Sequence, residues 1–226
     1  MPSLCHACSP AASFRALPGV TPQEYNARFT LSSSDFAQGC LPGMSFALTL
    51  YPMPYSFFPT AFGNCGIAWN ETGLIGFQLP EPDGEEMAHK FGARTQTKPA
   101  AEARPEWVRR LVEHVQQHFE GRLHDFSATP IDWSRVSDFQ QAVYLQTQAI
   151  KPGYKKSYGE IAQLLALGTQ AARAVGVALA TNPWPLIVPC HRVVSADNKM
   201  TGFSGSGGVL TKTRLLTLEG AELLSE

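Results

Sequence analysis

The chain has 226 residues, of which 44% are hydrophobic and 16% are charged, and its formal net charge at pH 7 is −1. This composition is typical of a folded protein with room for two domains, and it excludes a strongly basic chain that would hold nucleic acid through its overall charge. Residues 151–226 hold eight Lys or Arg against five Asp or Glu, a balance of +3, which leaves −4 for residues 1–150. Such an excess suits a local contact with DNA, and a solvated surface explains it equally well.

Five cysteines stand in the chain, at Cys5, Cys8, Cys40, Cys65 and Cys190. An odd number without paired spacings predicts no disulfide framework, so we expect a reducing compartment: the cytoplasm, or the nucleus in a eukaryote. Cys5 and Cys8 have the spacing of metal ligands, but no second pair follows at zinc spacing. We therefore expect an exposed tail there, and neither a metal nor another cofactor.

Residues 1–43 mix Pro, Ser, Gly and Ala without sustained periodicity, and we expect an irregular extension of unassigned role. The apolar stretch 44–62 is broken by prolines and follows no charged segment, so we expect no transmembrane helix and no membrane partner. Residues 46–51 alternate as a strand should, and Cys65–Asn70 with Leu74–Leu79 predict a hairpin. Together these strands predict a small antiparallel sheet.

Residues 80–103, rich in Pro, Glu, Lys, Thr and Ala, predict a surface connection. Pro105 then opens a helix that ends at Gly121, and its apolar face consists of Trp107, Leu111, Val115 and Phe119. His114 and His118 lie four residues apart on this helix, which is a possible metal-binding spacing. No third ligand is near, however, so we expect two solvated histidines.

A proline-containing segment at residues 129–133 predicts a link between two domains. The expected organisation is therefore an extension over 1–43, a sheet-plus-helix domain over 44–132 and a second domain over 133–226. In the second domain, Ser137 is placed to cap a helix that ends at residues 151–153, with a core-facing side formed by Phe139, Val143 and Ile150.

A helix–turn–helix pattern follows, with helices over 158–166 and 170–180 and a break at 167–169, where Thr169 is expected to cap the second helix. One face of the second helix is apolar, and the other carries Arg173, Gly176 and Ala180. Because Gly176 and Ala180 have small side chains, this face suits either close packing on another helix or entry into a narrow DNA groove. The pattern alone leaves both interpretations open.

The segment Leu186–Val194 places a thiol beside an imidazole. Its branched apolar residues predict a buried strand, and Pro189 predicts that the chain leaves the sheet there. A free cysteine is most often an inert buried hydrophobe, but His191 and Arg192 beside Cys190 favour the thiolate, which is the strong nucleophile. Adjacent residues on an extended chain point to opposite sides, so we expect a proton relay rather than a direct Cys190–His191 pair.

The pentapeptide Pro189-Cys190-His191-Arg192-Val193 resembles the acceptor-cysteine motif of the O6-alkylguanine-DNA alkyltransferases, also called methylated-DNA–protein-cysteine methyltransferases. Further blocks stand in the family's order and close to its spacing, so that the resemblance covers about the last ninety residues. These blocks are Phe139-Gln140 with Val143-Tyr144, Ser157 to Ala162, Ala172 to Gly176, Asn182-Pro183, Gly202-Phe203-Ser204, and Lys212 to Gly220.

The resemblance implies an α+β fold with a small N-terminal antiparallel-sheet domain that is ribonuclease H-like. It implies a mostly helical C-terminal domain with a winged-helix-like helix–turn–helix. The implied function is repair: the protein flips O6-alkylguanine, and also O4-alkylthymine, from double-stranded DNA and transfers the alkyl group irreversibly to Cys190. The implied protein is a single-turnover methyltransferase that acts as a monomer without a cofactor. Some members carry a structural zinc in the first domain, but no residue here matches those ligands.

The resemblance also implies a role for each site residue. Glu219 acts through His191 and a water on Cys190, Asn182 orders the turn before the thiol, and Tyr158 promotes rotation of the base and protonates the leaving guanine. Arg173 takes the place of the extruded base. Other implied DNA contacts are Gly159, Gly176 and Ala180, and the implied pocket residues are Pro189, Val193, Phe203 and Ser204. Arg192 is expected to pair with a carboxylate or a carbonyl for structure.

Two features depart from the family pattern. The turn over residues 202–208 is about two residues longer than the commonest form, which leaves the pocket width open, and Phe203 lacks the hydroxyl that a tyrosine would bring. Three alternatives remain: a lesion-binding relative without transfer activity, a helix–turn–helix regulator with a buried cysteine, and a cysteine hydrolase using Cys190, His191 and Glu219.

Overall fold

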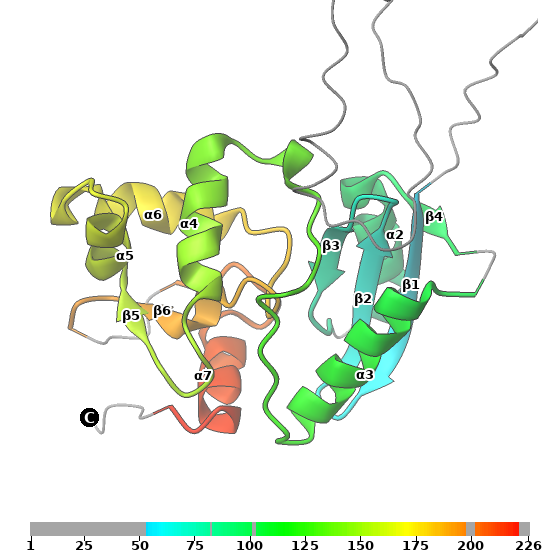
Figure 1. Cartoon of the computed structure of the whole chain (residues 1–226). Helices are drawn as coiled ribbons and strands as arrows, with labels where there is room; N and C mark the ends of the chain where they lie inside the picture. The colour runs from blue at the N-terminus through cyan, green and yellow to red at the C-terminus, as the bar shows by residue number, and fades with distance from the viewer. Residues whose placement is uncertain (1–52, 82, 101–102, 198–201, 222–226) are drawn as a thin grey trace, which may run out of the picture. The chain divides into compact units, whose positions relative to one another are not determined.

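The computed structural model describes residues 53–81, 83–100, 103–197 and 202–221 (Figure 1). They belong to a compact unit that spans residues 50–226. The predicted extension over 1–43 and the strand over 46–51 lie outside the described residues. The described part combines helices with a small sheet, as an α+β fold requires. Its division into domains at residues 132 and 133 stays a prediction.

The sheet has four strands in the order β3-β2-β1-β4. The predicted hairpin is confirmed, because β2 (Gly63–Trp69) and β3 (Leu74–Gln78) pair antiparallel. Strand β1 (Pro54–Thr60) was not predicted, because prolines interrupt its apolar pattern. It tolerates them because Pro54 is its first residue and Pro59 lies beyond the two-residue β4 (Lys98–Pro99), which pairs with β1 only at Pro54 and Tyr55.

The prediction of a surface connection over residues 80–103 is wrong, because helix α2 (Gly84–Thr95) lies within it. The carboxylate of Asp83 accepts hydrogen bonds from two backbone N–H groups of the first turn and caps the helix. Met87, Phe91 and Thr95 follow at four-residue spacing and are buried. The polar composition of the segment concealed this narrow apolar stripe.

The predicted helix after Pro105 is confirmed as α3 (Glu106–Phe119), with Leu111, Val115 and Phe119 buried. The predicted cap at Ser137 is also confirmed, since Ser137 and Gln140 form a reciprocal capping box that begins α4 (Asp138–Gln148). On α4, Val143 is buried as predicted, whereas Phe139 is 38% exposed and does not face the core.

The helix–turn–helix consists of α5 (Tyr158–Leu164), a 3-10 turn η2 (Thr169–Ala171) and α6 (Ala172–Ala180). The prediction that Thr169 caps the second helix is wrong. The chain first makes the η2 turn, and α6 then begins without a side-chain cap. A two-stranded parallel ladder joins β5 (Lys156–Ser157) to β6 (Val193–Val194), and α7 (Gly208–Leu218) follows.

Strand β3 supports the turn that precedes the cysteine. The backbone N–H of Phe77 donates to the carbonyl of Pro183 at 2.9 Å, and the indole N–H of Trp184 donates to the carbonyl of Leu74 at 3.0 Å. Trp184 is fully buried and packs edge-on against Trp133, with ring centroids 5.3 Å apart. The turn over 182–184 is therefore held by the sheet.

In the described part of the chain, no helix is both long and apolar enough to cross a membrane.

Candidate functional site

The segment before Cys190 is buried as predicted, but it is not a strand. Residues 185–188 form a turn closed by a bridge between Pro185 and Val188, and Leu186 has a φ of +75°. Cys190–Arg192 then form a 3-10 turn, η3, that leads into β6. Two prolines that cannot donate to a ladder, together with the left-handed residue, prevent an extended strand.

Cys190 is 6% exposed, and its sulfur lies next to Asn182. The Asn182 side-chain amide donates to Cys190 Sγ at 3.3 Å and to the carbonyl of Val188 at 2.8 Å, while its oxygen accepts from the backbone N–H of Trp184. Burial raises the pKa of the Cys190 thiol, although the Asn182 hydrogen bond and the charge of Lys212 oppose this. The resting group is therefore a thiol that needs a base before it can react.

His191 follows Cys190 in the chain, and its Nε2 lies 3.0 Å from Oε1 of Glu219, with both side chains fully buried. Burial opposes ionisation of Glu219, but hydrogen bonds from His118, His191 and Arg192 outweigh it and lower the pKa of the carboxyl. Burial lowers the pKa of His191, and Glu219 only partly offsets this. Because Nε2 faces a carboxylate, we assign the proton to Nε2, which leaves Nδ1 as an acceptor.

Nδ1 of His191 is buried and has no hydrogen-bond partner among the described residues. Among the described residues, no hydrogen bond joins the Cys190 thiol directly to the His191 imidazole, which fits a relay with a water between the two side chains. Arg192 has the structural pairing that we predicted: Nε and Nη2 donate to the two oxygens of Glu219 at 2.9 and 2.7 Å, and Nη1 donates to the carbonyl of Ile150.

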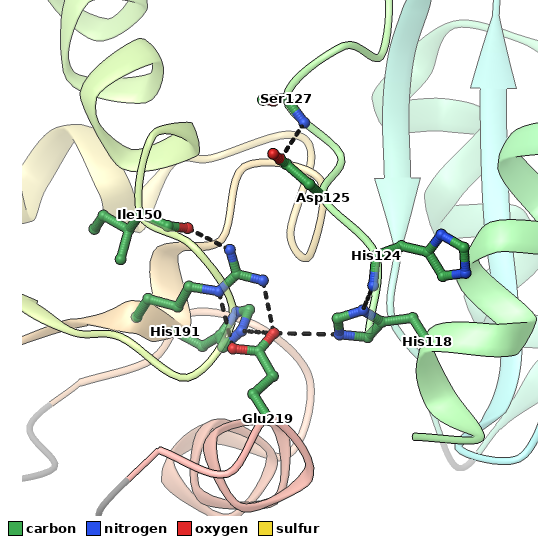
Figure 2. A network of polar contacts seen from close by, with 8 residues as sticks. His118, His124, Asp125, Ser127, Ile150, His191 and Glu219 are labelled. Carbon is green, nitrogen blue, oxygen red and sulfur yellow. Dashed lines mark hydrogen bonds and ion pairs between the residues drawn. The ribbon is translucent and has the colours of Figure 1, made fainter. Parts of the chain in front are cut away.

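The prediction that His118 is solvated is wrong. Its side chain is fully buried, and its Nε2 lies 3.2 Å from Oε1 of Glu219. Figure 2 shows this contact between the two side chains. The sequence did hold a signal, because His118 follows Leu111 and Val115 at helical spacing on the apolar face of α3. His114, one turn earlier, is exposed as predicted.

A cavity of about 310 Å³ reaches Cys190 from the helix–turn–helix side. It collects predicted site residues from four places in the sequence: Tyr158, Gly176 with Ala180, Cys190, and Phe203 with Ser204. A Cβ on Gly176 would lie 3.8 Å from the Tyr158 ring, so the bare helix face leaves room beside that ring. Burial, and then the charge of Cys190, raise the pKa of the Tyr158 hydroxyl.

Other predicted residues do not line this cavity, among them Gly159, Pro189 and Val193. Gly159 faces Thr169 on the η2 side, Pro189 begins the η3 turn, and the carbonyl of Val193 accepts a hydrogen bond from buried Lys212 at 2.7 Å. Arg173 lies exposed on the first turn of α6, where no described residue accepts a hydrogen bond from it. Among the residues that the structure covers, no three His, Cys, Asp or Glu are grouped to hold a metal, and Cys5 and Cys8 lie outside them.

Comparison with known proteins places this geometry in a family. Residues 138–221 match the family model described as the DNA-binding domain of 6-O-methylguanine DNA methyltransferase. A methylated-DNA–protein-cysteine methyltransferase of Mycolicibacterium paratuberculosis is 44% identical over 48% of this chain. The matched part of this chain spans 62% of that relative's length.

A second protein of that name, from Haemophilus influenzae, is 33% identical over 64% of this chain and 81% of its own length. The solved Mycobacterium tuberculosis OGT in complex with DNA is 34% identical, with a TM-score of 0.60, over 74% of this chain and 92% of the solved one. This chain therefore belongs to the methylated-DNA–protein-cysteine methyltransferase family.

Proposed function

We propose that the protein rotates an O6-alkylguanine nucleotide out of double-stranded DNA and transfers the alkyl group irreversibly to Cys190. One observation carries this proposal: the sulfur borders a cavity of about 310 Å³, and the His191–Glu219 pair lies behind it. That volume is at the lower end of the range for small-molecule pockets, which suits one base. A base inside a duplex cannot reach a sulfur at the bottom of a cavity, so extrusion is required, at a cost of a few kcal/mol.

In the proposed reaction, the Cys190 thiol gives its proton through a water to Nδ1 of His191, and Glu219 stabilises the imidazolium that forms. The thiolate attacks the alkyl carbon, so that a sulfur–carbon bond forms as the bond from carbon to guanine O6 breaks. Guanine leaves with the electron pair and takes a proton from the Tyr158 hydroxyl. A thioether is a poor leaving group, so one molecule performs one transfer and needs no cofactor.

The exposed part of α6 supports the proposed DNA contact. Arg173 is free to enter the space that the base vacates, and the small residues Gly176 and Ala180 permit close approach of the helix to a groove. Gly159 at the start of α5 would lie near the same backbone, and Pro189 and Val193 would support the pocket from behind η3. These roles rest on the family resemblance together with the exposure of α6.

Further parts of this assignment are also proposals. We expect O4-alkylthymine as a second substrate, action as a monomer, and location in the cytoplasm, or the nucleus in a eukaryote. We also expect the sheet part to be ribonuclease H-like and the helix–turn–helix to be winged-helix-like. Each of these rests on the family resemblance, apart from the compartment, which rests on cysteine usage.

Incubation of the full chain with a duplex that contains O6-methylguanine tests the proposal. The expected result is a permanent gain of one methyl group on the peptide that bears Cys190, found by mass spectrometry, with the peptide of buried Cys65 unchanged as an internal control. Binding without mass gain would instead support the lesion-binding protein or the regulator, and turnover of an ester or amide would support the hydrolase.

Two variants separate binding from transfer. Cys190→Ala should keep DNA binding and abolish transfer, because only the nucleophile is removed. Arg173→Ala should lose much of both, whereas the matched change Arg110→Ala, at an exposed arginine on α3, should lose neither. Methyl transfer by Cys190→Ala would contradict the choice of acceptor.

A further inference from the structure

Three side chains converge on one oxygen of Glu219. Oε1 lies 2.7 Å from Nη2 of Arg192, 3.0 Å from Nε2 of His191 and 3.2 Å from Nε2 of His118. Arg192 and His191 belong to the turn that carries the cysteine, whereas His118 comes from the last turn of α3, 101 residues before Glu219 in the sequence (Figure 2). A helix outside the acceptor motif therefore supplies a partner to the carboxylate behind the thiol.

The surroundings of His118 determine which ring nitrogen carries its proton. Nδ1 of His118 accepts a hydrogen bond from the backbone N–H of His124 at 3.1 Å. A nitrogen that accepts from a backbone N–H carries no proton, so the proton is on Nε2 and points at Glu219. The loop after α3 thus orients His118 as a donor, and the packing of its ring against Phe126 holds it there, with centroids 5.3 Å apart.

We propose that His118 is a positioning residue for the activation of Cys190: it holds Oε1 of Glu219, takes a share of its charge and thereby sets how strongly His191 accepts the proton of the thiol. An additional donor leaves less negative charge for His191, so the imidazolium is less stabilised. The lowered pKa values of Glu219 and His191 agree with this, because His118 contributes to both. The inference rests on the proposed function only in that Cys190 reacts as a thiolate.

Few other charged side chains act on His191 and Cys190. Glu219 from the end of α7, Arg192 from the η3 turn and His118 from α3 bear on His191, and Lys212 from α7 bears on Cys190. On the far side of His118, the ring of His124 stacks on that of His114 with centroids 4.4 Å apart. Burial and then the charges of His114, His118 and Arg122 lower the pKa of His124.

Two substitutions isolate the hydrogen bond to Glu219 from the packing of the ring. The amide nitrogen of a glutamine reaches the place of Nε2, so His118→Gln keeps a donor to Glu219. The shorter side chain of His118→Asn reaches only the place of Nδ1, so it keeps a partner for His124 and loses Glu219. Both variants lose the imidazole ring, which makes them matched controls for packing, and His114→Gln on the exposed face controls for loss of a histidine.

The measured quantity is the pH midpoint of iodoacetamide reaction at Cys190, followed on its own peptide in the full chain. We expect His118→Gln and His114→Gln to keep the midpoint of the unaltered protein. His118→Asn should shift it to lower pH by about one unit, because His191 becomes the stronger base. Equal midpoints for the Gln and Asn variants would overturn the proposal. The iodoacetamide assay contains no DNA, so its outcome does not depend on alkyl transfer. Failure of transfer from O6-methylguanine would count against the proposed function and leave the role of His118 standing.

A measurement on the unaltered protein covers the case in which His118→Asn does not fold. Nitrogen-15 NMR of the imidazole rings at neutral pH should show the Nε2–H tautomer for both His118 and His191. A His118 ring that carries its proton on Nδ1 would overturn the proposal, because it then has no hydrogen to give to Glu219.

Discussion

Replacing Arg192 with methionine should destabilise the folded protein strongly, because the change leaves a carboxylate buried without a cation. Glu219 is fully buried, and Arg192 supplies two of the four hydrogen bonds that it receives, at 2.7 and 2.9 Å. Methionine fills a similar volume without a donor. Removing one partner of a buried pair costs about 3–5 kcal/mol in free energy of unfolding. The carbonyl of Ile150 also loses its donor, so we expect a value within this range rather than below it.

The loss in free energy of unfolding caused by Arg192→Met should depend on pH in a definite direction. In the unaltered protein the pKa of Glu219 is lowered by folding, so its contribution is fully present above the ordinary value of 4.5 and disappears only as pH falls through the folded pKa. Without Arg192 the folded carboxyl takes up a proton more readily. The destabilisation should therefore be smaller at pH 5 than at pH 7.

Urea unfolding followed by tryptophan fluorescence at these two pH values measures both effects. Arg110→Met is the control, because its ion pair with Glu106 is exposed and such pairs contribute about 0–1 kcal/mol. A loss for Arg192→Met no greater than that of the control, or an equal loss at pH 5 and pH 7, would refute the reasoning that Arg192 compensates a buried charge.

Two further predictions concern the support of the site and the selectivity of its thiol. Trp184→Phe should lower the free energy of unfolding by about 0.5–1.5 kcal/mol, since one hydrogen bond to Leu74 is lost and that carbonyl keeps the backbone N–H of Asp132; an unchanged urea midpoint would contradict this. Burial, partly offset by a hydrogen bond between Cys65 and Thr60, raises the pKa of Cys65 to about 12. Cys65 should therefore stay unlabelled by iodoacetamide at pH 8 until the protein is unfolded, and peptide masses would reveal any earlier labelling.

Local signals in the sequence predicted the elements whose stabilising contacts lie close by in the chain. Ser137 caps α4 through a residue three positions away, and the hairpin joins β2 to β3 through one short turn. Helix α2 was missed, although its capping Asp83 and its stripe of apolar residues are local too, because acidic and basic residues surround that stripe. The strand predicted before Cys190 was wrong, since prolines and the left-handed Leu186 turn the chain.

By itself, the sequence determined the acceptor motif, the order of its supporting blocks and therefore the family to which this chain belongs. Only the tertiary structure decided that His118 meets Glu219, because the 101 residues between them impose no spacing that a pattern can show. It likewise decided that Arg192 and His191 share a single carboxylate, and that strand β3 holds the turn before Cys190. The physical reason is the same in each case: buried polar groups must find partners, and in a folded chain those partners come from whichever element packs nearest.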